Sequence, residues 1–407
     1  MEYYCVIKKF TGGFMFTLVQ KKKQNTQSIE GNILKSHDIF GKYQSDCLKG
    51  IAIIMLIAHH CFLGPSRYKG QELIFIIPES VWNYVALFFK ICVSLFVFIS
   101  AYGLTKKMMS LPKDADSQTA HKFIGNMILS RVIRLLGGFI FVFLLVDIFA
   151  LFYDPGRLAE IYGSVFPLNM EYYILDMLGL AQLLGTPTFL GTYWYYSLAL
   201  ILIVLVPLFY LLLEKVGSLA FLCAVAVLNF TVTFGNINIW HYILCIAVGI
   251  AAAYGNTITR MVQFRICGNN VINKILKFLL EFSGILLVMS VREGPLKGVL
   301  YPFWDAVIPV MVTAFGCEFL FSLPGLKQVL RFLGVYSANI FLVHNYIRRV
   351  WFYDFTYSFK YPLLIVNVLM IISLMLSIGI EFLKKILHYN EAVGKIVKLV
   401  SRGSRKR

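Results

Sequence analysis

Residues 46–63 read DCLKGIAIIMLIAHHCFL, a stretch long enough to cross the hydrocarbon core of a bilayer as one helix. Its centre is apolar, and ionisable side chains stand towards both ends. Burying such groups in lipid is costly, so they are functional candidates by default. Lys49 and His60 are eleven residues apart, about 16 Å along a helix and on nearly the same face. The stretch predicts a membrane helix with a cation at one mouth and an imidazole deeper on the same wall.

Similar apolar stretches recur along the 407 residues, of which 58% are hydrophobic and 14% are charged. A soluble domain is about half apolar and a quarter charged, so this chain is suited to lipid rather than water. We therefore predict an all-α, polytopic membrane bundle of about ten transmembrane helices. The expected spans are residues 46–63, 85–104, 131–153, 192–213, 218–235, 239–255, 274–290, 301–321, 332–350 and 361–383.

The net charge is +17, and the basic residues are distributed as a membrane topology predicts. If both termini are cytoplasmic, 29 of the 38 Lys and Arg residues fall on the cytoplasmic side, as the positive-inside rule requires. The basic residues form no continuous stripe with interleaved aromatics, which argues against a nucleic-acid partner. We expect a multi-pass protein of the plasma or inner cell membrane.

The expected organisation has three parts: a basic cytoplasmic tail over residues 1–42, a membrane domain over 43–383, and a second basic cytoplasmic tail over 384–407. Residues 160–190 contain Pro167, Glu171, Asp176 and Pro187, and suit an interfacial or re-entrant stretch better than a span. Whether the first tail is ordered stays open.

No sequence motif indicates a metal or a resident cofactor. The eight cysteines stand singly without a C-x-x-C pair, and no H-E-x-x-H or nucleotide-binding glycine loop is present in a suitable context. We expect no metal site and no cofactor.

Four further segments carry short motifs in a fixed order. They are 95–104 (LFVFISAYGL), 130–135 (SRVIRL), 192–198 (TYWYYSL, followed by Pro207) and 333–344 (LGVYSANIFLVH). Together with the first span, these motifs resemble the acyltransferase-3 family of membrane O-acyltransferases from about residue 43 to 383. In that family an Arg, here Lys49, precedes an essential His by eleven positions. The chain also has Ala101 where Gly is frequent, and Ser197 is followed by apolar residues where many members place Glu.

The resemblance implies a transferase that moves an acyl group, expected to be acetyl, from cytoplasmic acyl-CoA to a hydroxyl of an envelope or cell-surface glycan. The acceptor is a carbohydrate or a lipid-linked glycan. His60 is implied as the catalytic residue, a general base for the acceptor hydroxyl. His59, its neighbour, has no role assigned. A secondary transporter or polysaccharide exporter is the alternative, although the inverted repeats common in transporters are not evident.

Two sets of residues are expected to bind the substrates. Arg131 and Arg134 are one helical turn apart, which suits bidentate capture of diphosphate oxygens, although topology anchors would look the same. The expected acyl-CoA-binding residues are Lys49, Ser100, Arg131 and Arg134. The expected acceptor-binding residues are His344, Asn339, Asp305 and Trp194, each of which could instead serve helix packing or an interfacial aromatic belt. The acyl group, the acceptor and the oligomeric state stay open.

Overall fold

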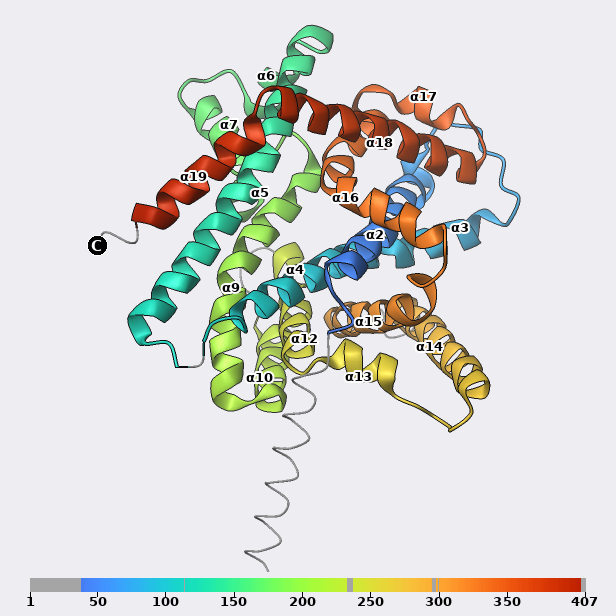
Figure 1. The fold of residues 1–407 in the computed structure, drawn as a ribbon. Coiled ribbons are helices and arrows are strands. Elements are labelled where there is room, and N and C mark those ends of the chain that lie inside the picture. Colours follow the sequence, from blue (N-terminus) through green and yellow to red (C-terminus); the bar gives the residue numbers. More distant parts are fainter. Residues whose placement is uncertain (1–37, 113, 233–236, 295–297, 299, 404–407) are drawn as a thin grey trace, which may run out of the picture. The chain divides into compact units, whose positions relative to one another are not determined.

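The computed structural model of the protein describes residues 38–112, 114–232, 237–294, 298 and 300–403. By its internal contacts the chain divides into residues 1–39 and 40–407, and the fold below is that of the second unit (Figure 1). The described residues form helices and turns without a strand, which confirms the all-α prediction. Most of the predicted N-terminal tail, residues 1–37, lies outside the described residues.

The α-helices follow one another in chain order. They are α2 (Lys42–Phe62), α3 (Glu79–Phe88), α4 (Cys92–Met108), α5 (Ser117–Tyr153), α6 (Arg157–Tyr162), α7 (Leu168–Met177), α8 (Ala181–Leu184), α9 (Trp194–Val216), α10 (Ser218–Thr231), α11 (Ile237–Trp240), α12 (Ile243–Tyr254), α13 (Thr257–Gln263), α14 (Asn270–Glu293), α15 (Tyr301–Phe315), α16 (Leu326–Asn345), α17 (Tyr353–Tyr357), α18 (Pro362–Ile386) and α19 (Tyr389–Gly403). Short 3-10 turns (η1, Pro65–Arg67; η2, Phe89–Ile91; η3, Gly191–Tyr193) and π-helical turns (η4, Gly316–Leu320; η5, Tyr346–Trp351) join or extend them.

Each of the ten predicted spans coincides largely with helix, but fewer than ten helices have the length and composition of a span. Among the described residues, seven helical stretches are long and apolar enough, and α12 with α13 adds an eighth if this bent pair counts as one. Helix α10 has only 14 residues. Helix α14 is long enough but carries Lys277, whose ammonium is 2.5 Å from a carboxylate oxygen of Glu318 on η4. The membrane bundle is confirmed, and its count of ten is not.

Helices α2 and α16 cross in close contact at two glycines. A Cβ on Gly334 would lie 1.7 Å from the carbonyl oxygen of Asp46, and a Cβ on Gly50 would lie 2.0 Å from that of Leu330. Any side chain at either position would clash with backbone, so the two helices approach this closely only because both residues are glycine. From this crossing, α16 runs beside α2 to the end of α2 that carries His60.

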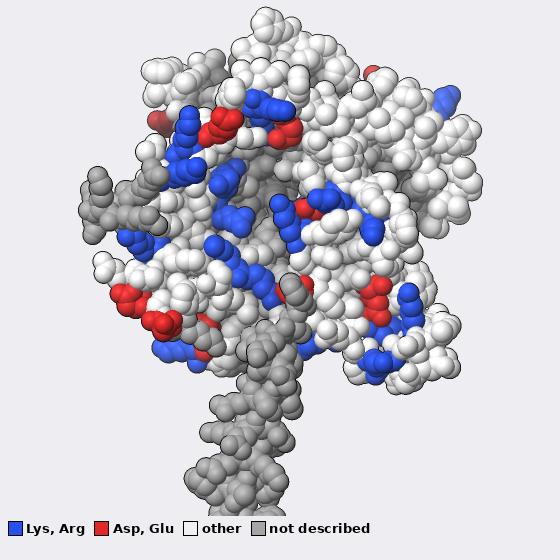
Figure 2. Space-filling view, viewed as in Figure 1, with Lys and Arg blue, Asp and Glu red and all other residues white. Residues whose placement is uncertain are grey.

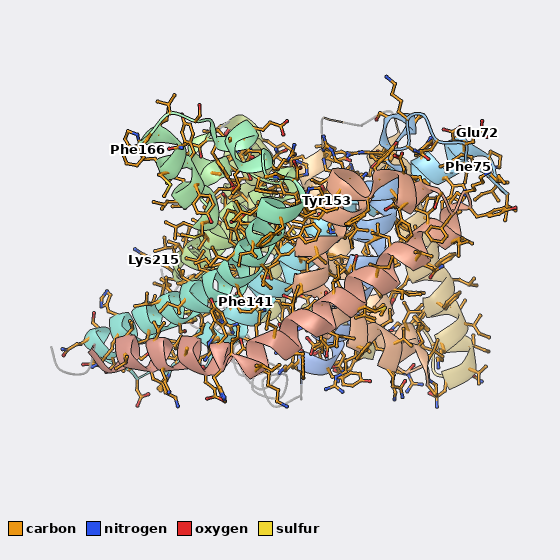
Figure 3. The ribbon with its side chains drawn as sticks, turned by 90° about the horizontal axis from the view of Figure 1, so that it is seen from above. Glu72, Phe75, Phe141, Tyr153, Phe166 and Lys215 are labelled. Carbon is orange, nitrogen blue, oxygen red and sulfur yellow. The ribbon has the colours of Figure 1, made fainter. Side chains whose placement is uncertain are left out.

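Helix α4 lies among other helices and contacts α2, α9 and α12 (Figure 1). Its residues Leu95, Val97 and Phe98 are fully buried. Figure 3 shows the unit from above: the loop with Glu72 and Phe75 lies at one edge, and the faint red ribbon of α19 runs along the opposite edge.

Residues 160–190 form three short helices, α6 to α8, none of which is long enough to cross a bilayer. The carboxylate of Asp176 ties the segment together: it accepts hydrogen bonds from the Tyr162 hydroxyl at 2.7 Å, the Thr188 hydroxyl at 2.8 Å and the Phe189 amide at 2.6 Å. Burial raises the pKa of Asp176 despite these donors. The network fixes the chain just before η3, which borders the candidate site.

The predicted C-terminal tail continues as regular structure. Helix α18 extends to Ile386 and α19 follows, packed on α5. The Tyr389 hydroxyl donates to the Gly137 carbonyl at 2.9 Å, and Val393 lies against the same glycine.

Candidate active site

The structure brings His60 of α2 and His344 of α16 into direct contact, although 284 residues separate them. Nδ1 of His60 is 2.7 Å from Nε2 of His344, and the two rings are stacked with their centroids 4.9 Å apart. His344 is fully buried, whereas His60 keeps some exposure. The glycine crossing of α2 and α16 is what permits this contact.

The partners of His344 determine where the protons lie in this pair. Its Nδ1 is 2.8 Å from the Phe341 carbonyl oxygen and 3.1 Å from that of Ile340. Carbonyl oxygens only accept hydrogen bonds, so Nδ1 carries the proton and, in the neutral ring, Nε2 accepts. His60 Nδ1 then donates to His344 Nε2, which leaves Nε2 of His60 with a lone pair.

Asn345 adds a third contact to the pair. Its Oδ1 accepts from Nε of Arg348 at 2.8 Å, which orients the amide so that Nδ2 lies 3.1 Å from His60 Nδ1. This second contact becomes a hydrogen bond only when His60 Nδ1 lacks its proton. Asn345 can therefore support the state in which that proton has passed to His344.

A cavity of about 420 Å³ lies beside His60, at the end of α2 and the start of α4, and is called the histidine cavity below. This volume is in the range of small-molecule sites. Both aromatic and basic side chains line it. The lining residues are Leu56, His59, His60, Leu63, Arg67, Leu87, Lys90, Cys92, Val93, Leu190, Gly191, Thr192, Trp194, Tyr195, Phe341, Asn345, Arg348 and Arg349.

Trp194 and His59 have defined positions at this cavity. Trp194 lies in the wall and stacks on Tyr242 with ring centroids 5.9 Å apart. A ring nitrogen of His59 donates to the Ala86 carbonyl at 2.7 Å. That bond turns one nitrogen of His59 away from His60, while its ring still borders the cavity.

A second cavity, of about 610 Å³, lies between the end of α4, the first half of α5 and α19. Lys107, Arg131 and Arg134 line it together with Ser130 and Ser401. Among the described residues these three cations make no ion pair. Figure 2 shows the face that carries α5 and α19, on which Lys and Arg side chains gather around a hollow. The arrangement suits an anionic ligand.

The two cavities lie at opposite ends of α4, because Val93 lines the first and Lys107 lines the second. Val93 and Lys107 are 14 positions apart, which corresponds to roughly 21 Å of helix. The cavities have no lining residue in common. Ser100 lies midway between them, and the hydroxyl of Tyr195, a residue of the first cavity, lies beside it.

Lys49 and Asn339 make their contacts away from both cavities. Lys49 Nζ is 2.9 Å from a carboxylate oxygen of Asp46 on its own helix. The amide nitrogen of Asn339 donates to Glu381 of α18 at 2.8 Å, so Asn339 links two helices. The structure does not bring either side chain to the histidine pair.

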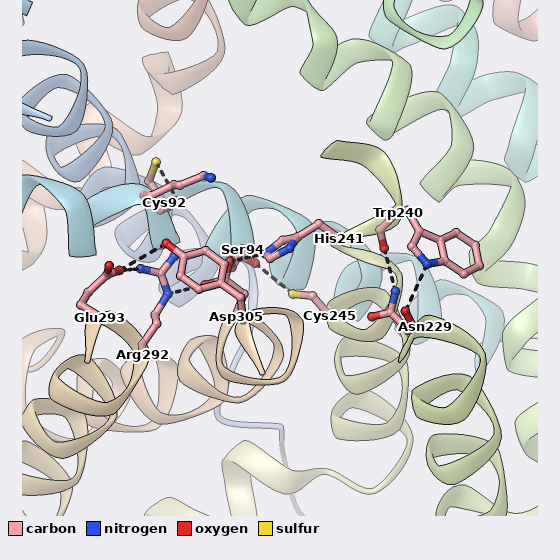
Figure 4. Close-up of polar contacts among 11 residues, drawn as sticks. Cys92, Ser94, Asn229, Trp240, His241, Cys245, Arg292, Glu293 and Asp305 are labelled. Carbon is pink, nitrogen blue, oxygen red and sulfur yellow. Dashed lines mark hydrogen bonds and ion pairs between the residues drawn. The ribbon is translucent and has the colours of Figure 1, made fainter. Parts of the chain in front are cut away.

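Asp305 is part of a separate buried cluster (Figure 4). Its two carboxylate oxygens bind Nε of Arg292 at 2.7 Å and Nε2 of His241 at 2.6 Å. Arg292 also contacts the neighbouring Glu293. Asp305 and Arg292 are fully buried, and neither lines the histidine cavity. The pairing of His241 with Asp305 cannot be predicted from the sequence, because the neighbours of His241 in the chain are apolar and carry no motif.

Four basic residues of the histidine cavity were also missed. Arg67, Lys90, Arg348 and Arg349 come from separate parts of the chain, and the sequence presents them only as topology residues. The sequence sets them apart in one respect: they are among the nine Lys and Arg residues that the predicted topology leaves on the outer side. Among the described residues no cluster of His, Cys, Asp and Glu could hold a metal ion.

Comparison with known proteins gives one match. The model of the acyltransferase domain that defines the acyltransferase-3 family matches residues 42–382, most of the chain. Neither curated proteins nor solved structures gave a match. The matched segment holds the whole lining of the cavity beside His60 and nearly all the candidate spans. The chain is therefore a multi-pass membrane acyltransferase that belongs to the acyltransferase-3 family.

Proposed function

We propose that the protein is an O-acyltransferase that moves an acyl group, most simply acetyl, from acyl-CoA to a hydroxyl of an envelope or cell-surface glycan. The donor binds at the cavity of Arg131 and Arg134 on the cytoplasmic side of the plasma membrane. The acceptor enters the histidine cavity from the opposite side. The observation that carries this proposal is that His60, in contact with the buried His344, lines a cavity at the opposite end of α4 from the cavity of Arg131 and Arg134.

The chemistry assigns His60 Nε2 as the general base. A hydroxyl of the acceptor attacks the thioester carbonyl carbon while its proton moves to Nε2 of His60. The C–S bond then breaks, and the proton passes to the leaving thiolate, so the products are an ester and free CoA. The hydrogen bond to His344 lets the pair share the positive charge that forms on His60.

The donor must span the bundle. The guanidinium groups of Arg131 and Arg134 bind its phosphate oxygens, and Lys107 adds a third positive charge. The extended pantetheine arm runs along α4 past Ser100 and delivers the thioester to His60. Sequestering the thioester within the bundle protects it from hydrolysis.

Substitution of the proposed base tests the assignment. His60→Ala should slow acyl transfer from labelled acyl-CoA by about 10²- to 10⁴-fold, the contribution typical of a general base. His121→Ala, which changes an exposed histidine of α5 outside both cavities, is the matched control. Full transfer by a folded His60→Ala protein would contradict the mechanism.

A flux assay separates this proposal from a transporter. In liposomes without an acyl donor, the purified protein should not move glycan across the bilayer. With donor outside and acceptor inside, or the reverse, only one arrangement should give ester. Glycan flux that needs no donor would favour an exporter.

A further inference from the structure

The histidine cavity is strongly one-sided in charge. Among the described residues that line it, four are basic and none is acidic. The basic residues are Arg67, Lys90, Arg348 and Arg349. They come from η1, η2 and η5, so three separate segments of the chain place positive charge on one wall. A cavity that bound only a neutral sugar would have no need of this arrangement.

Arg348 is a buried cation without a carboxylate partner. It is 2% exposed, and its Nε donates to the neutral amide of Asn345 at 2.8 Å. The hydroxyl of Tyr357, which itself donates to the Cys61 carbonyl at 3.1 Å, is its other polar neighbour. Burial of a guanidinium costs free energy unless an anion lies beside it. The protein supplies no such anion within the described residues.

Arg67 and Arg349 increase this excess of charge. Burial, together with the neighbouring guanidinium groups of Arg348 and Arg349, lowers the pKa of Arg67. Neither Arg67 nor Arg349 makes an ion pair among the described residues. Like charges held this close repel one another, and a bound anion would relieve the repulsion.

Three acidic residues near this end of the bundle have other partners. Glu79 accepts from the Tyr68 hydroxyl at 2.6 Å, and Asp354 accepts from the Gln71 amide at 2.7 Å. Asp305 is paired with Arg292 and His241. None of the three lines the cavity.

We propose that the acceptor carries an oxyanion group, a carboxylate or a phosphate, which Arg67, Arg348 and Arg349 bind while the acceptor hydroxyl lies at His60. The placement of the acceptor hydroxyl at His60 rests on the proposed function. The binding of an anion rests only on the residues that line the cavity. Guanidinium groups bind either oxyanion through paired hydrogen bonds. Trp194 and Tyr195 form the aromatic part of the same wall and can pack against a sugar ring.

The anion site is joined to the catalytic pair by hydrogen bonds. Arg348 holds the amide of Asn345, and that amide lies 3.1 Å from His60 Nδ1. An anion bound to Arg348 is therefore linked to His60 through one intervening residue, Asn345. Specificity follows, because a neutral acceptor would leave the buried cation uncompensated.

Matched acceptors test the proposal in nanodiscs of phosphatidylcholine. A glucuronic-acid oligosaccharide is compared with its carboxyl-reduced, neutral counterpart, and a glycerol-phosphate-bearing glycan forms the second arm. At least one acidic acceptor should exceed the neutral one in kcat/KM by about 10- to 100-fold, the effect of one or two charged hydrogen bonds. The acidic acceptor with the higher kcat/KM shows whether the oxyanion is a carboxylate or a phosphate.

Variants assign the effect to the cluster. Arg67→Gln/Arg349→Gln, in which neither side chain is fully buried, should abolish most of the preference and raise KM for the acidic acceptor. Arg157→Gln, which changes an arginine of α6 outside the cavity, should leave the preference intact. Equal use of neutral and acidic acceptors, or an unchanged preference in the double variant, would overturn the proposal.

A direct binding measurement tests the anion site independently of the proposed acyl transfer. If no acyl transfer occurs from any acyl-CoA, binding of the same oligosaccharides by calorimetry still decides whether the cavity selects an oxyanion. Loss of binding in Arg67→Gln/Arg349→Gln supports the inference even then. If the cluster instead responds only to added phosphatidylglycerol and never to the glycans, it is a lipid site and the proposal is wrong.

Discussion

His344 illustrates how one residue directs the chemistry of another. Its Nδ1 is committed to the carbonyl oxygens of Ile340 and Phe341 on its own helix, so its Nε2 is free to accept from His60. From the sequence, His344 is expected to bind the acceptor. The structure places its Nε2 2.7 Å from Nδ1 of His60, and His344 does not line the cavity beside that residue.

Because the two imidazoles form one hydrogen-bonded unit, their substitutions should not be additive. His344→Ala should slow transfer, and His60→Ala/His344→Ala should be no slower than His60→Ala alone. The measurement is kcat for the four proteins of the cycle. Independent, multiplicative losses would show that His344 acts on its own.

At the scale of elements, the crossing of α2 with α16 creates the site. Gly50 and Gly334 remove the side chains that would hold the helices apart. The motif segments that carry these glycines were recognised in the sequence for their histidines. The reason for the glycines is visible only when the two helices are placed together.

Gly334→Ala should therefore destabilise the protein, because its Cβ would overlap the Asp46 carbonyl. We expect a loss of about 1–3 kcal/mol, the usual cost of overpacking, together with a loss of transfer as His60 and His344 separate. Thermal unfolding in detergent, followed with an activity assay, checks both effects.

Gly103→Ala is the control for this substitution. A Cβ at Gly103, in the last part of α4, meets no atom within 4 Å. Because Ala favours the helix over Gly by up to about 1 kcal/mol, this variant should be as stable as the parent protein or more stable. Equal behaviour of the two glycine variants would remove the crossing from the explanation.

At the scale of the whole molecule, two cavities lie at opposite ends of α4, and in the proposed function each takes one substrate. The basic cavity of Arg131 and Arg134 lies beside α19, and the histidine cavity lies beside η1 and η5. Under the proposed function, this division would let one protein bind a donor from one face of a membrane and an acceptor from the other.

Substitutions at the two ends should therefore affect different substrates. Arg131→Ala/Arg134→Ala should raise KM for acyl-CoA by about 10- to 100-fold through lost charged hydrogen bonds, and leave KM for the acceptor unchanged. Arg260→Ala, which changes an exposed arginine of α13 outside the cavity, should alter neither constant. A rise in acceptor KM alone would place the donor elsewhere.

The amino-acid sequence by itself determined the membrane class, the helical segments and the family. Those features depend on local composition and on short motifs: an apolar run of about 20 residues specifies a helix in lipid wherever it lies in a chain. It also predicted roles for His60, Arg131 and Arg134, because each sits in a motif that can be read along one helix, and in the structure all three line cavities.

Only the tertiary structure decided which side chains meet. Contacts such as His60 with His344, Asp305 with His241 and Arg292, and the cluster of Arg67, Arg348 and Arg349 join segments that are far apart in the chain. Lys49 pairs with Asp46 on its own helix, whereas Asn339 bonds to Glu381 of α18, and neither side chain lines a cavity. Residue spacing fixes the face of a helix on which a side chain lies, but the partner of that face depends on how the helices pack.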